Sequence, residues 1–261
     1  MSNKPRIVFM YVKAGYGHIV PMKAIQDAFV RLYRDQFEVI SVYPLKDQNN
    51  PRLNRLGHML EHSTNVANRY PILGYGLCLL QKILPLRFVY YVMAKPKTRK
   101  AAVDLLKSYH ADALVSTHWF THYFAGFIHD EHLINIAYVP DAHILTLETA
   151  PSDLTIVSYD TCYQEALKKH PKRFNQNNLA LSSFPIREEI AHTNLDKIKA
   201  RELLHLPTNN LTLIFMDGSY GSKKTRKVIK KLLLSNMKLT IISIAGNHQS
   251  QSDYFKTLKI N

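Results

Sequence analysis

The chain has 261 residues, of which 46% are hydrophobic and 21% are charged. This composition excludes a disordered chain and allows a sizeable core, in one large domain or two smaller ones. Lysine and arginine total 34 against 20 acidic residues, which gives a net charge of +14. A charge of this sign indicates an anionic partner, such as membrane phospholipid, nucleic acid or a nucleotide phosphate, without choosing between them.

The two cysteines, Cys78 and Cys162, lie in apolar sequence and form neither a disulfide framework nor a metal set. This usage is typical of the reducing cytosol. The first apolar run ends at Val12. It is too short for the core of a signal peptide and lacks a small-residue cleavage site, so we interpret it as a strand.

The strand predicted at residues 6–12 leads into Gly15-Tyr16-Gly17-His18, and apolar residues then recur at helical spacing. A strand, a Gly-x-Gly turn and a helix N-terminus together favour an anionic or polar ligand. A dinucleotide fingerprint needs a third glycine, but Val20 and Pro21 occupy that place. The turn instead presents His18 at the carboxyl end of the first strand, where α/β folds place their chemistry.

Strand-like and helix-like segments alternate along the rest of the chain. Further strands are predicted at 37–43, 113–117, 134–139, 154–157, 179–181, 211–216 and 239–245. Helices are predicted at 52–68, 76–107, 123–128, 161–169, 196–204 and 223–234. This alternation implies an α/β fold with a parallel, doubly wound sheet. We expect a first domain over residues 1–195 and the start of a second Rossmann-like domain over 196–261, which is too short for an ordinary domain of this type.

Basic and apolar residues are concentrated between Glu61 and Asp104, where no acidic residue occurs. A transmembrane helix needs about 20 mostly apolar residues, and Gln81, Lys82 and Pro85 interrupt the run. Two interpretations remain open, namely docking on an anionic membrane surface and a helix pair whose basic face lies in water. The candidate membrane-binding residues are Lys82, Arg87, Lys95, Lys97, Arg99 and Lys100.

Three other motifs point to weaker hypotheses. Residues 217–224 lack the spacing of a P-loop, which argues against Walker-type ATP binding. His118 and His122 stand at i, i+4, but no zincin-like carboxylate lies between them and their aromatic neighbours indicate packing, so we expect no metal site. The basic run at 223–231 belongs to no recognised module, and we expect no nucleic-acid partner.

Five elements follow one another along the chain: Gly15-Tyr16-Gly17-His18, residues 113–118, Asp141, Pro185-Ile186-Arg187 and Gly218-Ser219-Tyr220-Gly221. In order and approximate spacing they resemble monogalactosyldiacylglycerol synthases and processive diacylglycerol glucosyltransferases, which are GT-B glycosyltransferases of family 28. The resemblance implies two Rossmann-like domains facing across a cleft. The lipid acceptor would bind to the N-terminal domain and the nucleotide sugar mainly to the C-terminal one.

The resemblance also implies roles for single residues. His18 would be the general base toward the acceptor hydroxyl, which suits an imidazole because it titrates near neutrality. Asp141 would orient His18 or bind the acceptor, with an ordinary turn residue as the alternative. The acceptor side would also include Gly15, Gly17, Thr117 and His118. The donor diphosphate would meet the backbone N–H groups of a loop with Gly218, Ser219 and Gly221, for which a plain turn is the alternative.

The implied activity moves a hexosyl unit from a nucleotide sugar, expected to be a UDP-sugar, to a diacylglycerol-type lipid acceptor. We expect no cofactor beyond this donor substrate and no obligatory metal. The expected location is cytoplasmic, peripheral at the inner face of the membrane, with anionic membrane lipids as partners. The chain stops before the family's Gly-Gly and Glu donor motif. One alternative is therefore a truncated, catalytically silent lipid-binding or regulatory homologue, and another is a related GT-B enzyme acting on a different acceptor.

Overall fold

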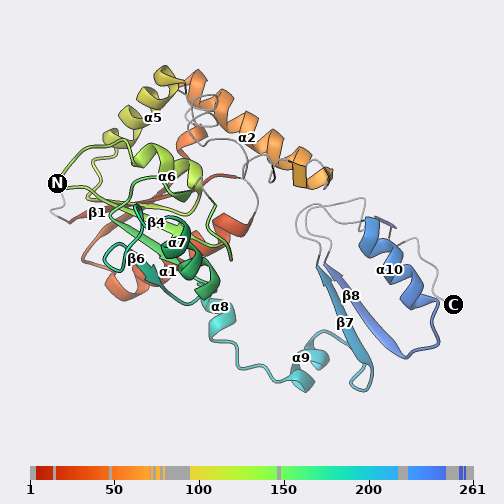
Figure 1. Cartoon of the computed structure of the whole chain (residues 1–261). Helices are drawn as coiled ribbons and strands as arrows, with labels where there is room; N and C mark the ends of the chain where they lie inside the picture. The colour runs from red at the N-terminus through yellow and green to blue at the C-terminus, as the bar shows by residue number, and fades with distance from the viewer. Residues whose placement is uncertain are drawn as a thin grey trace. The chain divides into compact units, whose positions relative to one another are not determined.

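The structure is a computed structural model. It describes residues 4–13, 16–46, 49–70, 72, 75–76, 79, 95–145, 148–216, 223–244, 253–254 and 256. The chain divides into two compact units, Met1–Ala191 and His192–Asn261. Each unit is described by its own elements, which Figure 1 labels.

A six-stranded parallel sheet forms the centre of the first unit. Its strands are β1 (Arg6–Met10), β2 (Glu38–Val42), β3 (Ala113–Ser116), β4 (Ile134–Val139), β5 (Leu154–Val157) and β6 (Leu179–Leu181). They lie in the order β2-β1-β3-β4-β5-β6, and every neighbouring pair is parallel. The chain runs from β1 outward to β2 and then returns to β3 on the other side of β1. The topological switch point therefore lies between β1 and β3.

Helices cover both faces of this sheet. They are α1 (Tyr16–Tyr33), the 3-10 helix η1 (Pro44–Lys46), α2 (Pro51–Arg69), α5 (Pro96–Ser108), α6 (Trp119–Ala125), α7 (Asp160–Lys169) and α8 (Glu188–Ala191). Alternate side chains of β1 supply the two faces. Ile7 and Phe9 pack with residues of α1, whereas Val8 and Met10 pack with residues of α2, α5 and α6. Figure 1 shows these helices on opposite sides of the sheet, which confirms the predicted α/β fold with a doubly wound parallel sheet.

Two helices begin earlier than the sequence suggested. Helix α1 begins at Tyr16, so Gly17 and His18 belong to its first turn and not to a separate loop. Helix α6 begins at Trp119 instead of residue 123, because the Nδ1 atom of His118 accepts the N–H of Phe120 at 3.1 Å and caps the helix. Histidine is not among the usual capping residues, so the pattern did not reveal this start.

The helix predicted over 76–107 is described only in part. Helix α5 starts at Pro96. Proline suits the first helical position, because an N–H at that position has no intrahelical partner and proline carries no N–H. Residues 80–94 lie outside the described residues.

The second unit begins another parallel α/β arrangement. Its elements are α9 (Lys197–Leu203), β7 (Leu211–Met216), α10 (Lys223–Leu233) and β8 (Leu239–Ile244). Strands β7 and β8 pair in parallel, so α10 lies within a β-α-β connection. The buried Arg201 donates to backbone carbonyls of residues 207, 208 and 210, which fixes the loop that enters β7. The predicted strands and helices of this unit are thus present.

Gly57 gives a stability prediction, because α2 approaches η1 closely at this residue. A Cβ at position 57 would overlap the carbonyl oxygen of Leu45, whereas a Cβ at position 17 meets nothing within 4 Å. We expect Gly57→Ala to lower the free energy of unfolding by about 1–3 kcal/mol, because α2 must move away from η1. Gly17→Ala should raise it by no more than about 1 kcal/mol, through helix propensity. Urea denaturation measures both; a Gly57→Ala variant as stable as the wild type would contradict the close packing.

Candidate active site

The carboxyl ends of β1 and β3 meet at the switch point, and a reciprocal pair of hydrogen bonds joins them there. The Nδ1 atom of His18 lies 2.7 Å from the carbonyl oxygen of Thr117. In return, the Thr117 hydroxyl donates to the carbonyl oxygen of His18 at 3.0 Å. The fold thus brings together His18, Thr117 and the adjoining His118, three residues of the predicted acceptor side.

This pair fixes the tautomer of His18. A carbonyl oxygen can only accept a hydrogen bond, so Nδ1 of His18 carries the hydrogen. In the neutral imidazole the lone pair is then on Nε2. A general base needs such a lone pair, together with a partner that orients its other ring nitrogen. The Thr117 carbonyl supplies that orientation.

His118 packs against His18 and stays neutral. The two ring centroids are 4.7 Å apart, with an interplanar angle of 69°. Burial lowers the pKa of His118 well below its usual range, and the positive charge of a protonated His18 lowers it further. Because Nδ1 of His118 accepts the Phe120 N–H, its hydrogen is on Nε2. His118 therefore does not compete with His18 for a proton.

Asp141 follows β4 and neighbours Glu148, and none of the described contacts joins it to His18. Glu148 is buried and accepts the N–H of Leu145 at 2.7 Å. Burial raises the pKa of Glu148 to about 8, and the Asp141 carboxylate adds to this rise. Burial beside Asp141 therefore favours the protonated form of Glu148. Among the described contacts, the predicted orientation of His18 by Asp141 is not formed, because the Thr117 carbonyl occupies Nδ1.

Glu148 also lines a pocket that the sequence did not predict. The pocket opens beside His118 at the carboxyl ends of β3 and β4, with about 200 Å³ of empty space that includes open solvent. Its lining includes Ser116, Trp119, His122 and Glu148. In the sequence, Glu148 is a single glutamate between two predicted strands. A single glutamate at such a place does not predict a pocket unless the fold is known.

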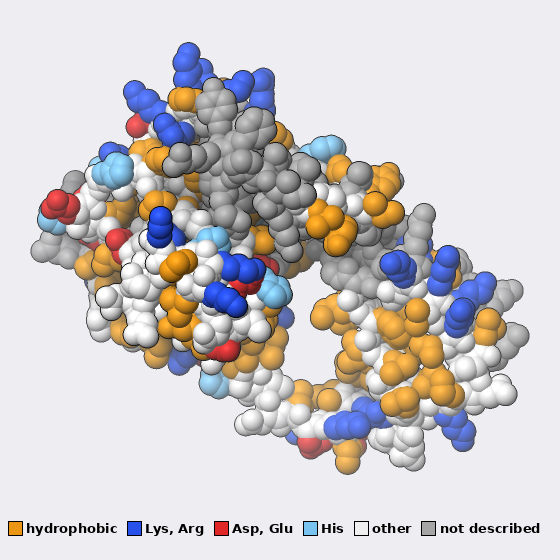
Figure 2. All heavy atoms as spheres, viewed as in Figure 1, with side chains coloured by type: hydrophobic (Ala, Val, Ile, Leu, Met, Phe, Trp, Pro, Cys, Tyr) orange, Lys and Arg blue, Asp and Glu red, His pale blue; other side chains and the backbone are white. Residues whose placement is uncertain are grey.

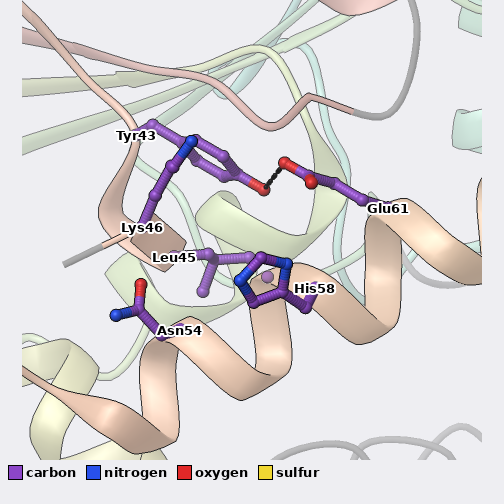
Figure 3. A pocket seen from close by; sticks show the side chains of 7 residues that line it. Tyr43, Leu45, Lys46, Asn54, His58 and Glu61 are labelled. Carbon is purple, nitrogen blue, oxygen red and sulfur yellow. Dashed lines mark hydrogen bonds between the residues drawn. The ribbon is translucent and has the colours of Figure 1, made fainter. Parts of the chain in front are cut away.

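A second pocket lies at the carboxyl end of β2, and Figure 3 shows its lining side chains. The hydroxyl of Tyr43 donates to Oε1 of Glu61 on α2 at 3.0 Å. Burial, followed by the Glu61 contact, raises the pKa of Tyr43 far above its ordinary value. The ring of Tyr43 also stacks on Tyr11, at a centroid distance of 5.6 Å. Tyr43 thus links α2 to the segment that leads from β1 toward His18.

Several predicted site residues lie outside the described residues. They are Gly15 of the first turn, Lys82 and Arg87 of the basic segment, and Gly218, Ser219 and Gly221 of the donor loop. The predicted donor site therefore stays a prediction. Gly17 is described, in the first turn of α1.

The described candidate membrane-binding residues lie in helix α5 and, for Lys95, at its N-cap. Lys95, Lys97 and Lys100 are exposed, and Figure 2 shows Lys and Arg side chains gathered over this helix. Arg99 differs, because its guanidinium lies over the ring of Phe127 at 4.6 Å from the centroid. This cation–π contact stabilises the packing of α5 on the segment after α6. Three of the four described cations thus face solvent, and the fourth has a structural contact.

Two negative findings concern the described residues alone. No group of three or more histidine, cysteine, aspartate or glutamate side chains there is arranged to hold a metal ion. No described helix combines the length and apolar character that crossing a membrane requires.

The comparisons with known proteins show likeness among solved structures only. No protein-family model matches the chain, and no curated protein matches it. Among solved structures, the crystal structure of Arabidopsis thaliana UGT89C1 complexed with UDP-L-rhamnose is similar, with a TM-score of 0.48 and 15% sequence identity. The similarity covers 94% of this chain and 66% of that one, so the chain spans just under two thirds of that protein's length.

The hydrogen bonds predict opposite tautomers for neighbouring histidines. His18 should carry its hydrogen on Nδ1, whereas His118 and His122 should carry theirs on Nε2, because Nε2 of His122 faces the Ala150 carbonyl at 2.7 Å. Long-range nitrogen–proton NMR spectra of the neutral imidazoles distinguish the two forms. His118 and His122 serve as internal controls, and an Nε2-protonated His18 would contradict the assignment of its base nitrogen.

Glu148 predicts a pH-dependent stability difference. The pKa of Glu148 is about 8 in the folded state and near 4.5 when unperturbed. As pH rises through this window the unfolded state ionises first, so the wild type loses stability relative to Glu148→Gln. The slope approaches about 1.4 kcal/mol per pH unit, up to a few kcal/mol in total. Urea denaturation at about pH 5 and about pH 9 measures this difference. The exposed Glu131→Gln should show the same difference from wild type at both pH values, and a flat profile for Glu148→Gln would refute the prediction.

Proposed function

We propose that this protein transfers a hexosyl unit from a nucleotide sugar, expected to be a UDP-sugar, to a diacylglycerol-type lipid acceptor at a membrane surface. The two α/β units would be the acceptor and donor sides of a GT-B enzyme, as the sequence resemblance implies. The observation that carries the proposal is the His18–Thr117 hydrogen bond, which leaves the Nε2 lone pair of His18 available at the switch-point crevice.

The proposed step is a direct displacement at the anomeric carbon. The acceptor hydroxyl donates to Nε2 of His18, and its proton moves to that nitrogen as the oxygen attacks. The bond between the anomeric carbon and the diphosphate oxygen breaks, and the diphosphate leaves with the bonding electrons. The imidazolium that forms keeps its Nδ1–H bond to the Thr117 carbonyl, which stabilises the new positive charge. Because His118 stays neutral, it adds no repulsion to this charge.

Two surface features support membrane docking. Lys97 and Lys100 of α5 and Lys95 at its N-cap are exposed, so they can attract anionic headgroups. In the same segment of the sequence Ile72 is 87% exposed and Tyr75 is 67% exposed, although large apolar side chains usually avoid water. Cations and exposed apolar side chains together suit a protein that is peripheral at an anionic bilayer.

A catalytically silent, lipid-binding or regulatory homologue is the second candidate. The exposed lysines of α5 favour it, since their attraction to anionic lipid does not depend on His18 or on a donor site. Binding to anionic vesicles that weakens with salt, without transfer of any sugar, would support this alternative.

The test is a transfer assay with the full-length gene product, labelled UDP-hexoses and diacylglycerol in anionic vesicles. We expect transfer by the wild type and a loss of kcat/KM of about 100-fold or more in His18→Gln, which is the usual contribution of a general base. His129→Gln changes an exposed histidine and should retain wild-type activity. Equal rates for His18→Gln and the wild type would exclude His18 as the base.

A further inference from the structure

Helix α10 of the second unit presents a strongly basic surface that the candidate active site does not use. No acidic residue occurs between Asp217 and Asp253, whereas residues 223–238 include seven lysines and arginines. Figure 2 shows Lys and Arg side chains gathered where Figure 1 labels α10. A positive charge of this density, with no acidic residue to balance it, indicates a polyanionic partner.

The fold determines which side of α10 faces solvent. Ile229 is buried where the helix packs against β8. Lys227 and Lys231 stand two residues before and two after Ile229, so they lie on the opposite side of the helix. Lys230 adjoins Lys227 at i, i+3. These three lysines, which we call the lysine face, are exposed, and none of the salt bridges between described residues involves them.

Arg226 of the same helix has a structural contact. Its guanidinium lies over the ring of Tyr254, at 4.9 Å from the centroid. The outward charge of α10 is therefore carried by lysines. A lysine ammonium is a compact point charge on a flexible stem, whereas the arginine guanidinium recognises single phosphates with a fixed geometry. The lysine face thus suits attraction to a fluid surface of many anionic groups.

Exposed apolar side chains adjoin the lysine face where α10 ends. Leu234 is 76% exposed and Met237 is 56% exposed. The N–H of Leu234 donates to the carbonyl oxygen of Lys230 at 3.2 Å, so the chain keeps its helical turn at this residue. Leu234 follows Lys230 by four residues and Lys227 by seven, which places it in line with the lysine face.

This combination favours a lipid surface over nucleic acid. At an anionic bilayer, lysines attract the headgroups while neighbouring apolar side chains enter the boundary between headgroups and acyl chains. Proteins that bind single-stranded nucleic acid stack its bases on aromatic side chains. No aromatic residue occurs between Lys224 and Ile244. The exposed leucine and methionine therefore have a role at a bilayer that nucleic acid would not give them.

We propose that the lysine face of α10, together with Leu234 and Met237, is a docking surface for an anionic phospholipid bilayer. The second unit then has a membrane contact of its own, separate from helix α5 of the first unit. This contact depends neither on His18 nor on sugar transfer.

The test measures binding of the full chain to phosphatidylcholine vesicles with and without phosphatidylserine. The variant Lys227→Gln/Lys230→Gln/Lys231→Gln removes the lysine face and keeps helix-forming residues. One lysine near an anionic bilayer contributes about fivefold in affinity, so this variant should bind phosphatidylserine vesicles about 100-fold more weakly. The loss should shrink as salt screens the charges. Leu234→Gln should bind about tenfold more weakly, and this loss should persist in high salt.

Matched variants control for net charge, apolar content and folding. Lys4→Gln/Lys168→Gln/Lys172→Gln removes the same charge from exposed lysines of the first unit and should bind as the wild type does. Leu204→Gln changes another exposed leucine of the second unit and should also leave binding unchanged. Arginine at all three positions of the lysine face keeps the charge and should retain the affinity. Equal urea midpoints establish that the variants fold alike.

The outcomes separate this proposal from the proposed function. Equal affinities of the glutamine triple variant and the wild type for phosphatidylserine vesicles would overturn the docking surface. A duplex oligonucleotide that binds more tightly than the vesicles, and is lost in that variant, would assign the lysine face to nucleic acid and overturn it too. The assay contains no sugar donor, so vesicle binding through α10 without sugar transfer would retain the docking surface and reject only the transferase. Sugar transfer with unchanged vesicle binding in the variant would do the reverse.

Discussion

The bond between the His18 imidazole and the Thr117 carbonyl is the interaction on which the site depends. It joins two segments that are 99 residues apart, at the one place in the sheet where the chain changes direction. Helix α1 contributes less than usual to holding its own first turn, because Pro21 has no N–H to donate to the carbonyl of Gly17. The position and tautomer of His18 are therefore set mainly from β3.

The surroundings of this bond are polar, but they are kept free of charge. Burial holds His118 and His122 in their neutral forms and keeps Glu148 protonated. The charge of Arg173 contributes to the low pKa of His122. Its guanidinium donates to carbonyls of Ala150 and Ser152, which orders the loop that carries Glu148. A proton accepted by His18 would thus place a positive charge next to side chains that are neutral, namely His118, His122 and Glu148.

The fold was largely predictable from the sequence, because its signals are local. Strands β1 and β3 are short apolar runs bounded by polar residues, and they were found within one or two residues at each end. The start of α6 was missed, since the capping group is the His118 side chain. For the site, the sequence could predict which residues take part but not their hydrogen bonds or protonation states. Which atom of His18 is free depends on Thr117, and the neutral state of Glu148 depends on burial between distant segments, so neither can be inferred from spacing.

Side-chain hydrogen bonds link neighbouring strand ends at the carboxyl edge of the sheet. His18 in the first turn of α1 bonds to Thr117 after β3, and Tyr138 of β4 bonds to Ser158 after β5. The pocket lies between these two pairs, beneath His118 and Glu148. Its unpartnered atoms come from Ser116 at the end of β3 and from His122 on α6. Among the described residues at this edge, the buried side-chain atoms without a hydrogen-bond partner therefore lie close to the ring pair of His18 and His118.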